Sequence, residues 1–352
     1  MELGIYSFGD YVPDPPWGNG ISVQQRFANL LEEIELADQV GLDVFALGEH
    51  HRQDFIVSSP VTVLAAAASK TKRIRLGSAV TVLSSDDPVR VFQQFATLDL
   101  LSGGRAELMA GRGSFIESFP LFGYDLDDYE ELFSEKLELL LEIRKSTRVT
   151  WAGSGKFRAP LTGQEVLPRP VQDPFPISIA VGGSPASAAR AGMLGLPLSL
   201  AIIGGEPARF QPFVDLYREA GAQAGHSPET LQVQIGQHGF VADTDETAAE
   251  LAWPPYQLYM NRIGRERGWP PIGRSTFDAG RHERGHLVLG SPQKVIDKIL
   301  AENEYFRMNR FAMQFNVAGI DHRQMLRAIE LYGTVVAPAV RKAVGSPPPA
   351  DR

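Results

Sequence analysis

The stretch Ile74–Gly113, IRLGSAVTVLSSDDPVRVFQQFATLDLLSGGRAELMAGRG, decides the fold that the sequence predicts. It begins with a β-branched apolar run, Ile74–Val82, and continues after Pro88 with a segment whose apolar residues have helical spacing. It ends with a second apolar run, Ala106–Ala110, followed by Gly-Arg-Gly. A strand, a helix that crosses over and a second strand make a parallel βαβ unit.

The rest of the chain alternates in the same way. The strand segments are short apolar runs without polar alternation, which is typical of a parallel sheet covered on both faces. The predicted strands are Leu3–Phe8, Val44–Gly48, Ile74–Val82, Ala106–Ala110, Ile177–Val181, Pro197–Ile203, Leu231–Val241 and Arg310–Phe315. The predicted helices are Val23–Val40, Pro60–Ser69, the segment after Pro88, Leu126–Ile143, Ser184–Met193, Ala208–Ala224, Pro292–Glu302 and His322–Val344.

About eight strands with intervening helices in 352 residues predict an α/β fold, a (β/α)8 TIM barrel with insertions, as one domain over residues 1–344. The alternative is an open doubly wound sheet, which would more often have fewer strands and a G-x-G-x-x-G turn after the first one. The insertions are expected at about 151–175, which is loop-like with four prolines and three glycines, and at about 253–290. The tail, residues 345–352, is predicted to be disordered.

The second insertion, which precedes the last strand, is rich in arginine. A long segment without regular structure is usually functional or disordered. It is interpreted either as a solvated, partly helical excursion or as a mobile lid whose arginines contact an anionic substrate or a cofactor phosphate. The arginines are Arg262, Arg265, Arg267, Arg274, Arg281 and Arg284.

Composition limits the function classes. The chain is 43% hydrophobic and 22% charged, as in an ordinary soluble globular protein, and its net charge of −8 argues against nucleic-acid binding. It has no apolar stretch long enough to span a membrane and no secretion signal, so a cytoplasmic protein is expected. Without cysteine there is no disulfide, thiolate metal site or cysteine nucleophile.

Glu49-His50-His51 follows the second predicted strand. Neighbouring side chains on an extended chain point to opposite faces, so the two histidines cannot easily share one metal ion, and no metal site is predicted. One histidine is expected to face the pocket as a proton donor or hydrogen-bond partner with a pKa near neutrality. The alternative is that both only hydrogen-bond loop backbone.

Two glycine-containing turns are candidate phosphate sites. Gly111-Arg112-Gly113 combines close backbone approach with a guanidinium, although tight strand-to-helix turns often have this composition. Gly183, Ser184 and Ser187 lie where a strand ends and a helix begins, and free backbone N–H groups and hydroxyls there suit a phosphate. The alternative for Ser184 is a plain helix N-cap.

These positions, taken in order, resemble the bacterial luciferase-like flavin-dependent monooxygenases, from Leu3 to about Val340. The most specific match is Leu98–Arg105, LDLLSGGR, at the turn into the fourth strand. By this resemblance His50 corresponds to a catalytic histidine and Glu49 to a residue beside the flavin.

The resemblance also places cofactor contacts. It implies a non-proline cis peptide at Ala79–Val80 beneath the flavin ring, with backbone near Gly111 at the polar edge of the ring. Arg112 falls at the phosphate-binding arginine of the family, with Gly113 in the same turn. Gly183, Ser184 and Ser187 fall at its second phosphate loop.

Three positions depart from the family pattern. Gly111 replaces the reactive cysteine of luciferase, and Glu130 replaces a second phosphate arginine, so the phosphate contacts are expected to be rearranged, with lid arginines as substitutes. Ile202 lacks the aromatic side chain of luciferase, so light emission with a long-chain aldehyde is not implied.

The implied function is oxidation of a small organic substrate by reduced FMN and O2, with FMN supplied by a partner reductase, in a homodimer. The family also contains relatives that use the deazaflavin F420 for hydride transfer, which is the principal alternative. A non-catalytic flavin-binding relative and a metal-dependent barrel hydrolase are the two others.

Overall fold

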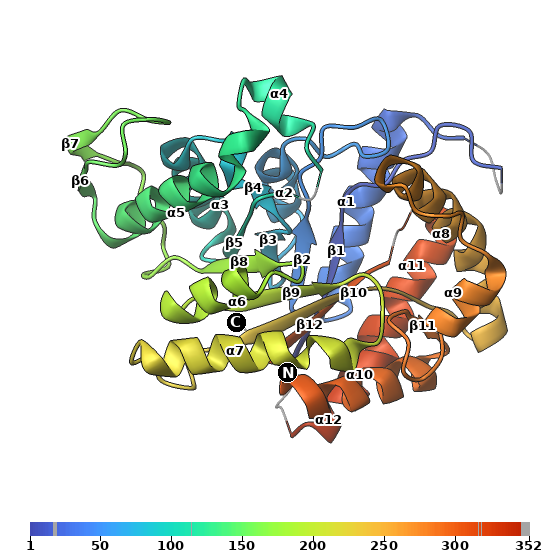
Figure 1. Cartoon of the computed structure of the whole chain (residues 1–352). Coiled ribbons are helices and arrows are strands. Elements are labelled where there is room, and N and C mark those ends of the chain that lie inside the picture. Colours follow the sequence, from blue (N-terminus) through green and yellow to red (C-terminus); the bar gives the residue numbers. More distant parts are fainter. Residues whose placement is uncertain (17–19, 114, 316, 318, 346–352) are drawn as a thin grey trace.

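The structure, a computed structural model, describes residues 1–16, 20–113, 115–315, 317 and 319–345. Its centre is a closed barrel of eight parallel strands surrounded by helices (Figure 1). β1 (Glu2–Ser7) closes the barrel, because it pairs with β2 (Val44–Leu47) on one side and with β12 (Arg310–Gln314) on the other. The predicted (β/α)8 barrel is confirmed, and the open doubly wound sheet is excluded.

The other barrel strands follow one another around the barrel in chain order. They are β3 (Arg75–Ser78), β5 (Ala106–Gly111), β8 (Ile177–Val181), β9 (Leu198–Ile202) and β10 (Val233–Val241). Two short strands add to this sheet: β4 (Thr81–Val82) pairs with β5, and β11 (Val288–Gly290) pairs with β10. Because all eight barrel strands are parallel, their carboxyl ends meet at one end of the barrel.

Most helices follow a barrel strand and cover the outside of the barrel. Short helical turns precede several of them, and a π-helical turn, Tyr332–Val336, joins the last two. The helices are α1 (Val23–Gln39), α2 (Pro60–Ala68), α3 (Pro88–Ser102), α4 (Ser118–Phe122), α5 (Tyr129–Lys145), α6 (Pro185–Met193), α7 (Gln211–Gln223), α8 (Asp245–Arg267), α9 (Arg274–Gly280), α10 (Pro292–Phe306), α11 (His322–Leu331) and α12 (Ala337–Ala343).

The stretch Ile74–Gly113, from which the fold was predicted, contains polar side chains that the structure now explains. Asp87 caps α3 by accepting hydrogen bonds from the N–H groups of its first turn, and Gly103 ends the helix with φ of 69°. The fully buried carboxylate of Asp99 accepts from the N–H of Ala106, at 3.2 Å, at the start of β5. Arg105 donates to the backbone carbonyls of residues 68, 71, 74 and 102. These side chains hold the crossover against the barrel.

Three expected elements differ from the structure. The strand predicted over Ile74–Val82 is interrupted after Ser78 and resumes at Thr81. The segment 151–175 is not simply a loop, because β6 (Arg148–Trp151) and β7 (Leu161–Glu165) form an antiparallel hairpin at the left of Figure 1. β7 is mostly exposed, so it has no apolar alternation that would reveal a strand.

The segment 253–290 is also more regular than expected. α8 runs through Pro254 and Pro255 as far as Arg267, and α9 follows within the same segment. Two adjacent prolines usually indicate a helix end, which is why the sequence did not predict this helix. Of the tail predicted to be disordered, residues 346–352 lie outside the described residues. Within the described residues, no helix has the length and apolar character needed to cross a membrane.

Candidate active site

A cavity of about 730 Å³ lies among the carboxyl-terminal residues of the barrel strands and the segments that follow them. This end of a TIM barrel is where active sites form, and the volume is in the range of small-molecule sites. Every barrel strand contributes to the lining, for example through Tyr6, Ala46, Ser78, Met109, Ala180, Leu200, His238 and Gln314.

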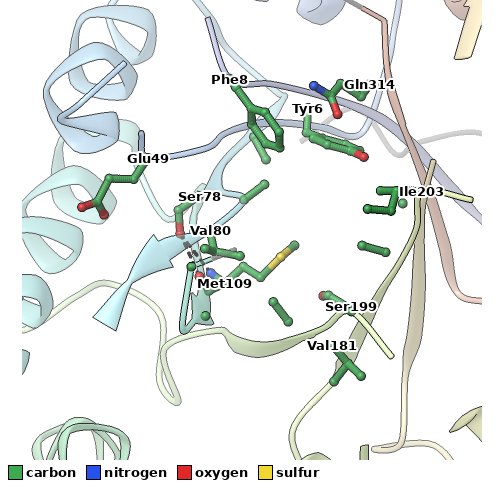
Figure 2. Close-up of a pocket in the computed structure, with 18 of the residues that line it drawn as sticks. Tyr6, Phe8, Glu49, Ser78, Val80, Met109, Val181, Ser199, Ile203 and Gln314 are labelled. Atoms are coloured by element: carbon green, nitrogen blue, oxygen red, sulfur yellow. Dashed lines mark hydrogen bonds between the residues drawn. The ribbon is translucent and has the colours of Figure 1, made fainter. Parts of the chain in front are cut away.

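Apolar side chains form the middle of the cavity. Val80 and Met109 lie on one side, and Val181 and Ile203 lie on the other (Figure 2). The hydroxyl of Ser78 accepts a hydrogen bond from the Met109 N–H at 3.1 Å, which fixes β3 against β5. The space between the two sides is a slot suited to an apolar ring system.

The peptide bond between Ala79 and Val80 is cis, as the resemblance predicted. Two backbone hydrogen bonds fix this segment against β2 and the residues that follow it. The Ala79 N–H donates to the Leu47 carbonyl at 2.8 Å, and the Glu49 N–H donates to the Val80 carbonyl at 3.2 Å. Gly111 leaves room for it, because a Cβ at Gly111 would lie 2.7 Å from the Val80 side chain. The glycine that replaces the reactive cysteine of luciferase therefore has a packing reason here.

Glu49 lines the cavity, and both of its carboxylate oxygens have partners. Oε2 accepts from the Val82 N–H at 2.9 Å, and Oε1 lies 3.0 Å from Nε2 of His51. The His51 ring packs edge-on against Phe122 at 5.1 Å. Glu49 and His51 thus connect the loop after β2 to β4.

His50 has different neighbours from His51 and lies among aromatic rings. It stacks on Phe55 at 4.4 Å and meets Phe8 and Phe115 edge-on at 4.5 Å and 5.0 Å. Its backbone N–H donates to Val57, but its ring lines the cavity, so the alternative in which it only bonds loop backbone does not describe it. Burial lowers the pKa of His50 to about 3, and nearby positive charge lowers it further. The expectation of a pKa near neutrality was wrong: the ring is neutral at neutral pH.

The two candidate phosphate turns meet at one edge of the cavity. The guanidinium of Arg112, just after β5, donates to the hydroxyl of Ser187 on α6 at 3.0 Å. Ser184 is the N-cap of α6, with its hydroxyl accepting from the Ser187 N–H, and Gly183 has φ of 117° in the preceding turn. Gly113 lines the cavity beside Arg112. The structure thus brings the two candidate phosphate turns together.

The carboxylate of Glu130 lies between two arginines. One of its oxygens forms an ion pair with Arg112, and the other lies 3.7 Å from the guanidinium of Arg190. Nη1 of Arg190 is buried and has no hydrogen-bond partner among the residues that the structure describes. Sequence reasoning missed Arg190, although it lies one helical turn after Ser187 on α6, a spacing that puts both side chains on one face. A second arginine is thus present near Arg112, supplied by α6 rather than by the predicted lid.

The arginines of the segment 253–290 are mostly engaged elsewhere. Arg267 lines the cavity, 5.9 Å from the Phe115 ring and 5.2 Å from the Trp269 ring. Four others pair with carboxylates away from Arg112: Arg262 with Asp54, Arg274 with Glu250 and Asp278, Arg281 with Asp278, and Arg284 with Glu206. These five ion pairs engage four of the six arginines that were expected as substitute phosphate contacts.

Residues of α8 line the cavity beside the strands. Tyr259, Met260 and Ile263 contribute to this wall, which the sequence did not predict because the helix itself was not predicted. In the part of the chain that the structure describes, no three His, Asp or Glu side chains are grouped so as to bind a metal ion.

Comparison with known proteins agrees with this geometry. Residues 1–308 match the luciferase-like monooxygenase family. The chain is 27% identical over 348 residues to 4-hydroxyprotoasukamycin monooxygenase of Streptomyces nodosus subsp. asukaensis, covering 94% of this chain and 91% of the relative. It is 23% identical over 295 residues to the oxygenase component of the flavin-dependent trigonelline monooxygenase of Acinetobacter baylyi, covering 79% and 80%. The crystal structure of monooxygenase RslO1 from Streptomyces bottropensis has the same fold, with a TM-score of 0.83, 24% identity and coverage of 96% and 99%.

Proposed function

The chain belongs to the luciferase-like monooxygenase family, and we propose on that basis that it is a flavin-dependent monooxygenase that uses reduced FMN and O2 to oxidise a small organic substrate. The observation that supports this most directly is the cavity, in which an apolar slot at Val80 adjoins the guanidinium of Arg112, which in turn contacts the Ser187 hydroxyl. FMN has the same two parts, an apolar ring system and a terminal phosphate.

The residues present fit the phosphate of FMN. Arg112 and Ser187 already hydrogen-bond each other, so both would reach one bound anion. The buried, unpartnered Nη1 of Arg190 supplies a further donor, and the N-terminus of α6 adds its dipole. The carboxylate of Glu130 lies between the two arginines, as an anion would, and would have to yield this place to the phosphate.

The slot fits the ring system. Val80 and Met109 would contact one face and Val181 and Ile203 the other side, while backbone at the ends of β4 and β5 offers polar groups to the ring edge. When bound and reduced, a flavin supplies electrons and reacts with O2. The protein's part is to position the ring and the substrate and to exclude water from the slot.

His50 is proposed as the catalytic residue. Its ring is held by Phe8, Phe55 and Phe115 and borders the cavity. Because the ring is neutral at neutral pH, it can donate one hydrogen bond and accept another, and it does not provide a permanent positive charge. Its task would be to hold or pass a proton at the reacting atoms.

The second candidate is hydride transfer with F420. Some members of the family use FMN and others use F420, and both cofactors carry phosphate. The arginine pair suits either phosphate, so this observation supports the alternative as well. The two reactions differ in that only the first one needs O2.

Titration of the purified protein with FMN and with F420, followed by absorbance, tests the proposal. We expect FMN to bind at about micromolar concentration and to bind more tightly than riboflavin, which lacks the phosphate. O2 consumption with a flavin reductase and NADH then tests the monooxygenase assignment. Binding of F420 alone would favour the second candidate, and failure of both cofactors to bind would overturn the proposal.

A separate flavin reductase is proposed as the partner. The trigonelline monooxygenase relative is described as an oxygenase component, which supports a division of reduction and oxygenation between two proteins. The same assay tests this point, since activity should require added reductase.

A further inference from the structure

Three neighbouring barrel strands place polar side chains at one level. Tyr6 on β1 is the register partner of Gln314 on β12, and Gln314 is the register partner of His238 on β10. Register partners on parallel strands point to the same face of the sheet. All three residues line the cavity, and Tyr6 and Gln314 lie together in Figure 2. We call Tyr6, Gln314 and His238 the polar row.

The polar row has hydrogen-bonding atoms without well-aligned partners among the described residues. Gln314 is 1% exposed, and both its amide nitrogen and its amide oxygen are buried without such a partner. His238 is 4% exposed, and its Nδ1 has no well-aligned partner in this part of the chain either, although Gln314 is near enough to raise its pKa. Buried polar groups are nearly always hydrogen-bonded, because leaving them unpaired costs about 1–3 kcal/mol each. Unpaired hydrogen-bonding atoms that line a cavity indicate that a bound ligand supplies their hydrogen-bond partners.

The polar row is uncharged at neutral pH. Burial lowers the pKa of His238 to about 3, with His286 lowering it further and Gln314 opposing the shift, so the imidazole is neutral. Burial and the nearby Asp10 raise the pKa of the Tyr6 hydroxyl above its usual value, so it stays protonated. The row therefore offers an amide, a neutral imidazole and a phenol, which together both donate and accept hydrogen bonds.

Charged residues that line the same cavity are engaged elsewhere. Arg310 and Glu107 pair at 2.7 Å at the other end of their strands, Arg112 pairs with Glu130, Glu117 pairs with Arg52, and Glu49 bonds His51 and Val82. Arg267 lies over the rings of Phe115 and Trp269. A carboxylate brought to the polar row would thus lose its hydration without meeting a positive charge there, and it would face the buried Asp10 that acts on Tyr6.

We propose that the polar row binds an uncharged hydrogen-bonding group of the substrate, of the carboxamide or phenol class, and that the row selects against carboxylates. The apolar remainder of the cavity would hold the apolar body of the same molecule. This inference rests on the proposed function, since it concerns the molecule that the flavin would oxidise. Gln314 is its specificity-determining residue.

Binding of three single-ring probes tests the proposal: benzamide, benzoate and toluene. Ligand-detected NMR measures their affinities for the FMN-loaded protein and for the flavin-free protein. We expect benzamide to bind about tenfold or more tightly than benzoate, because the polar row pairs with the amide and offers no positive charge to the carboxylate. Equal binding of benzoate and benzamide would overturn the proposal.

Gln314→Met keeps the length of the side chain and removes both hydrogen-bonding atoms. It should weaken benzamide about tenfold and leave toluene little changed. Gln237→Leu is the matched control, because Gln237 is also a buried glutamine near Gln314 but does not line the cavity. An equal loss of toluene and benzamide in Gln314→Met, or an equal loss of benzamide in both variants, would overturn the assignment.

The flavin titration separates this inference from the proposed function. A protein that discriminates benzamide from benzoate but binds neither FMN nor F420 would retain the polar row as a ligand site and refute the flavin proposal. A protein that binds FMN and shows no discrimination would refute only the polar row.

Discussion

Arg112 and Glu130 form an ion pair at the edge of the barrel cavity, in the place where a cofactor phosphate is proposed to bind. The guanidinium also donates to the Ser187 hydroxyl and lies over the Tyr129 ring at 5.2 Å. Glu130 is 59% exposed and lies on α5, so its side chain can turn to solvent. In the flavin-free protein, a carboxylate of this chain thus takes the position of an anion.

Glu130→Gln should strengthen FMN binding. The phosphate would no longer meet a carboxylate between the two arginines, but exposed ion pairs contribute only about 0–1 kcal/mol, so the expected gain is about threefold to fivefold. The gain should shrink at high salt, because exposed charges are screened. Fluorescence titration with FMN at two salt concentrations measures it, and Glu131→Gln, whose carboxylate pairs with Lys156, is the control. An unchanged FMN affinity would show that Glu130 does not compete with the phosphate.

Arg190→Gln should weaken FMN binding by about tenfold, because a charge-assisted hydrogen bond to phosphate is lost. Riboflavin should bind the variant and the wild type alike, since it has no phosphate for Arg190 to contact. Arg209→Gln removes an exposed arginine outside the cavity lining and serves as the control. If riboflavin and FMN weaken together, Arg190 supports the shape of the site and does not contact the phosphate.

His50→Gln should leave FMN binding nearly intact and lower kcat by about 10²–10⁴-fold, the usual contribution of a positioned proton donor or acceptor. Rates measured with saturating reductase and FMN separate this effect from cofactor loss. His51→Gln is the neighbouring comparison, because His51 also lines the cavity but bonds Glu49 and does not contact the three rings around His50. Unchanged turnover in His50→Gln would remove His50 from the catalytic role.

The fold could be predicted from the sequence because its strands are apolar and its crossovers have clear ends. Asp87, Pro88 and Gly103 mark α3 with a cap, a first-turn proline and a left-handed glycine. The hairpin of β6 and β7 lacked such a signal, since its residues are mostly exposed and polar. α8 was missed because two prolines within it imitate a helix end.

Only those parts of the site that lie within one short segment of the chain could be predicted from the sequence. Arg112 and Ser187 were each visible in a glycine-containing turn, and their contact follows from strand order in a barrel. The pairing of Arg112 with Glu130 and the neutral state of His50 depend on burial and on packing between distant segments. Sequence spacing does not contain that information.

Arg105→Met should destabilise the protein without changing the cofactor site. Arg105 belongs to the segment that most resembles the family, yet its guanidinium donates to backbone carbonyls and does not line the cavity. Loss of these bonds leaves buried carbonyls unpaired, and we expect about 3 kcal/mol less free energy of unfolding. Chemical denaturation measures it, with the exposed Arg90→Met on α3 as the control. Equal losses in both variants would contradict this structural role, as would a change in FMN affinity of the folded Arg105→Met protein.

His50 should also make the protein less stable in acid. Its pKa is about 3 in the folded chain against 6.5 for an ordinary histidine, so below pH 6.5 the unfolded chain takes up a proton that the folded chain does not. The free energy of unfolding therefore falls as the pH falls from 6.5 towards 3, by about 2 kcal/mol at pH 5 relative to pH 7.

Burial raises the pKa of Glu302 to about 7, which acts in the opposite direction on the pH dependence of unfolding. Glu302 is present in the wild type and in the His50 variant alike, so its contribution cancels when the two are compared. Urea denaturation of wild type and His50→Gln from pH 5 to 7 should thus show a shallower pH dependence in the variant, and His282→Gln, at an exposed histidine, is the matched substitution for comparison. Identical slopes for His50→Gln and wild type would mean that His50 titrates alike in the folded and unfolded chains, which would contradict the lowered pKa on which its neutral state in acid depends.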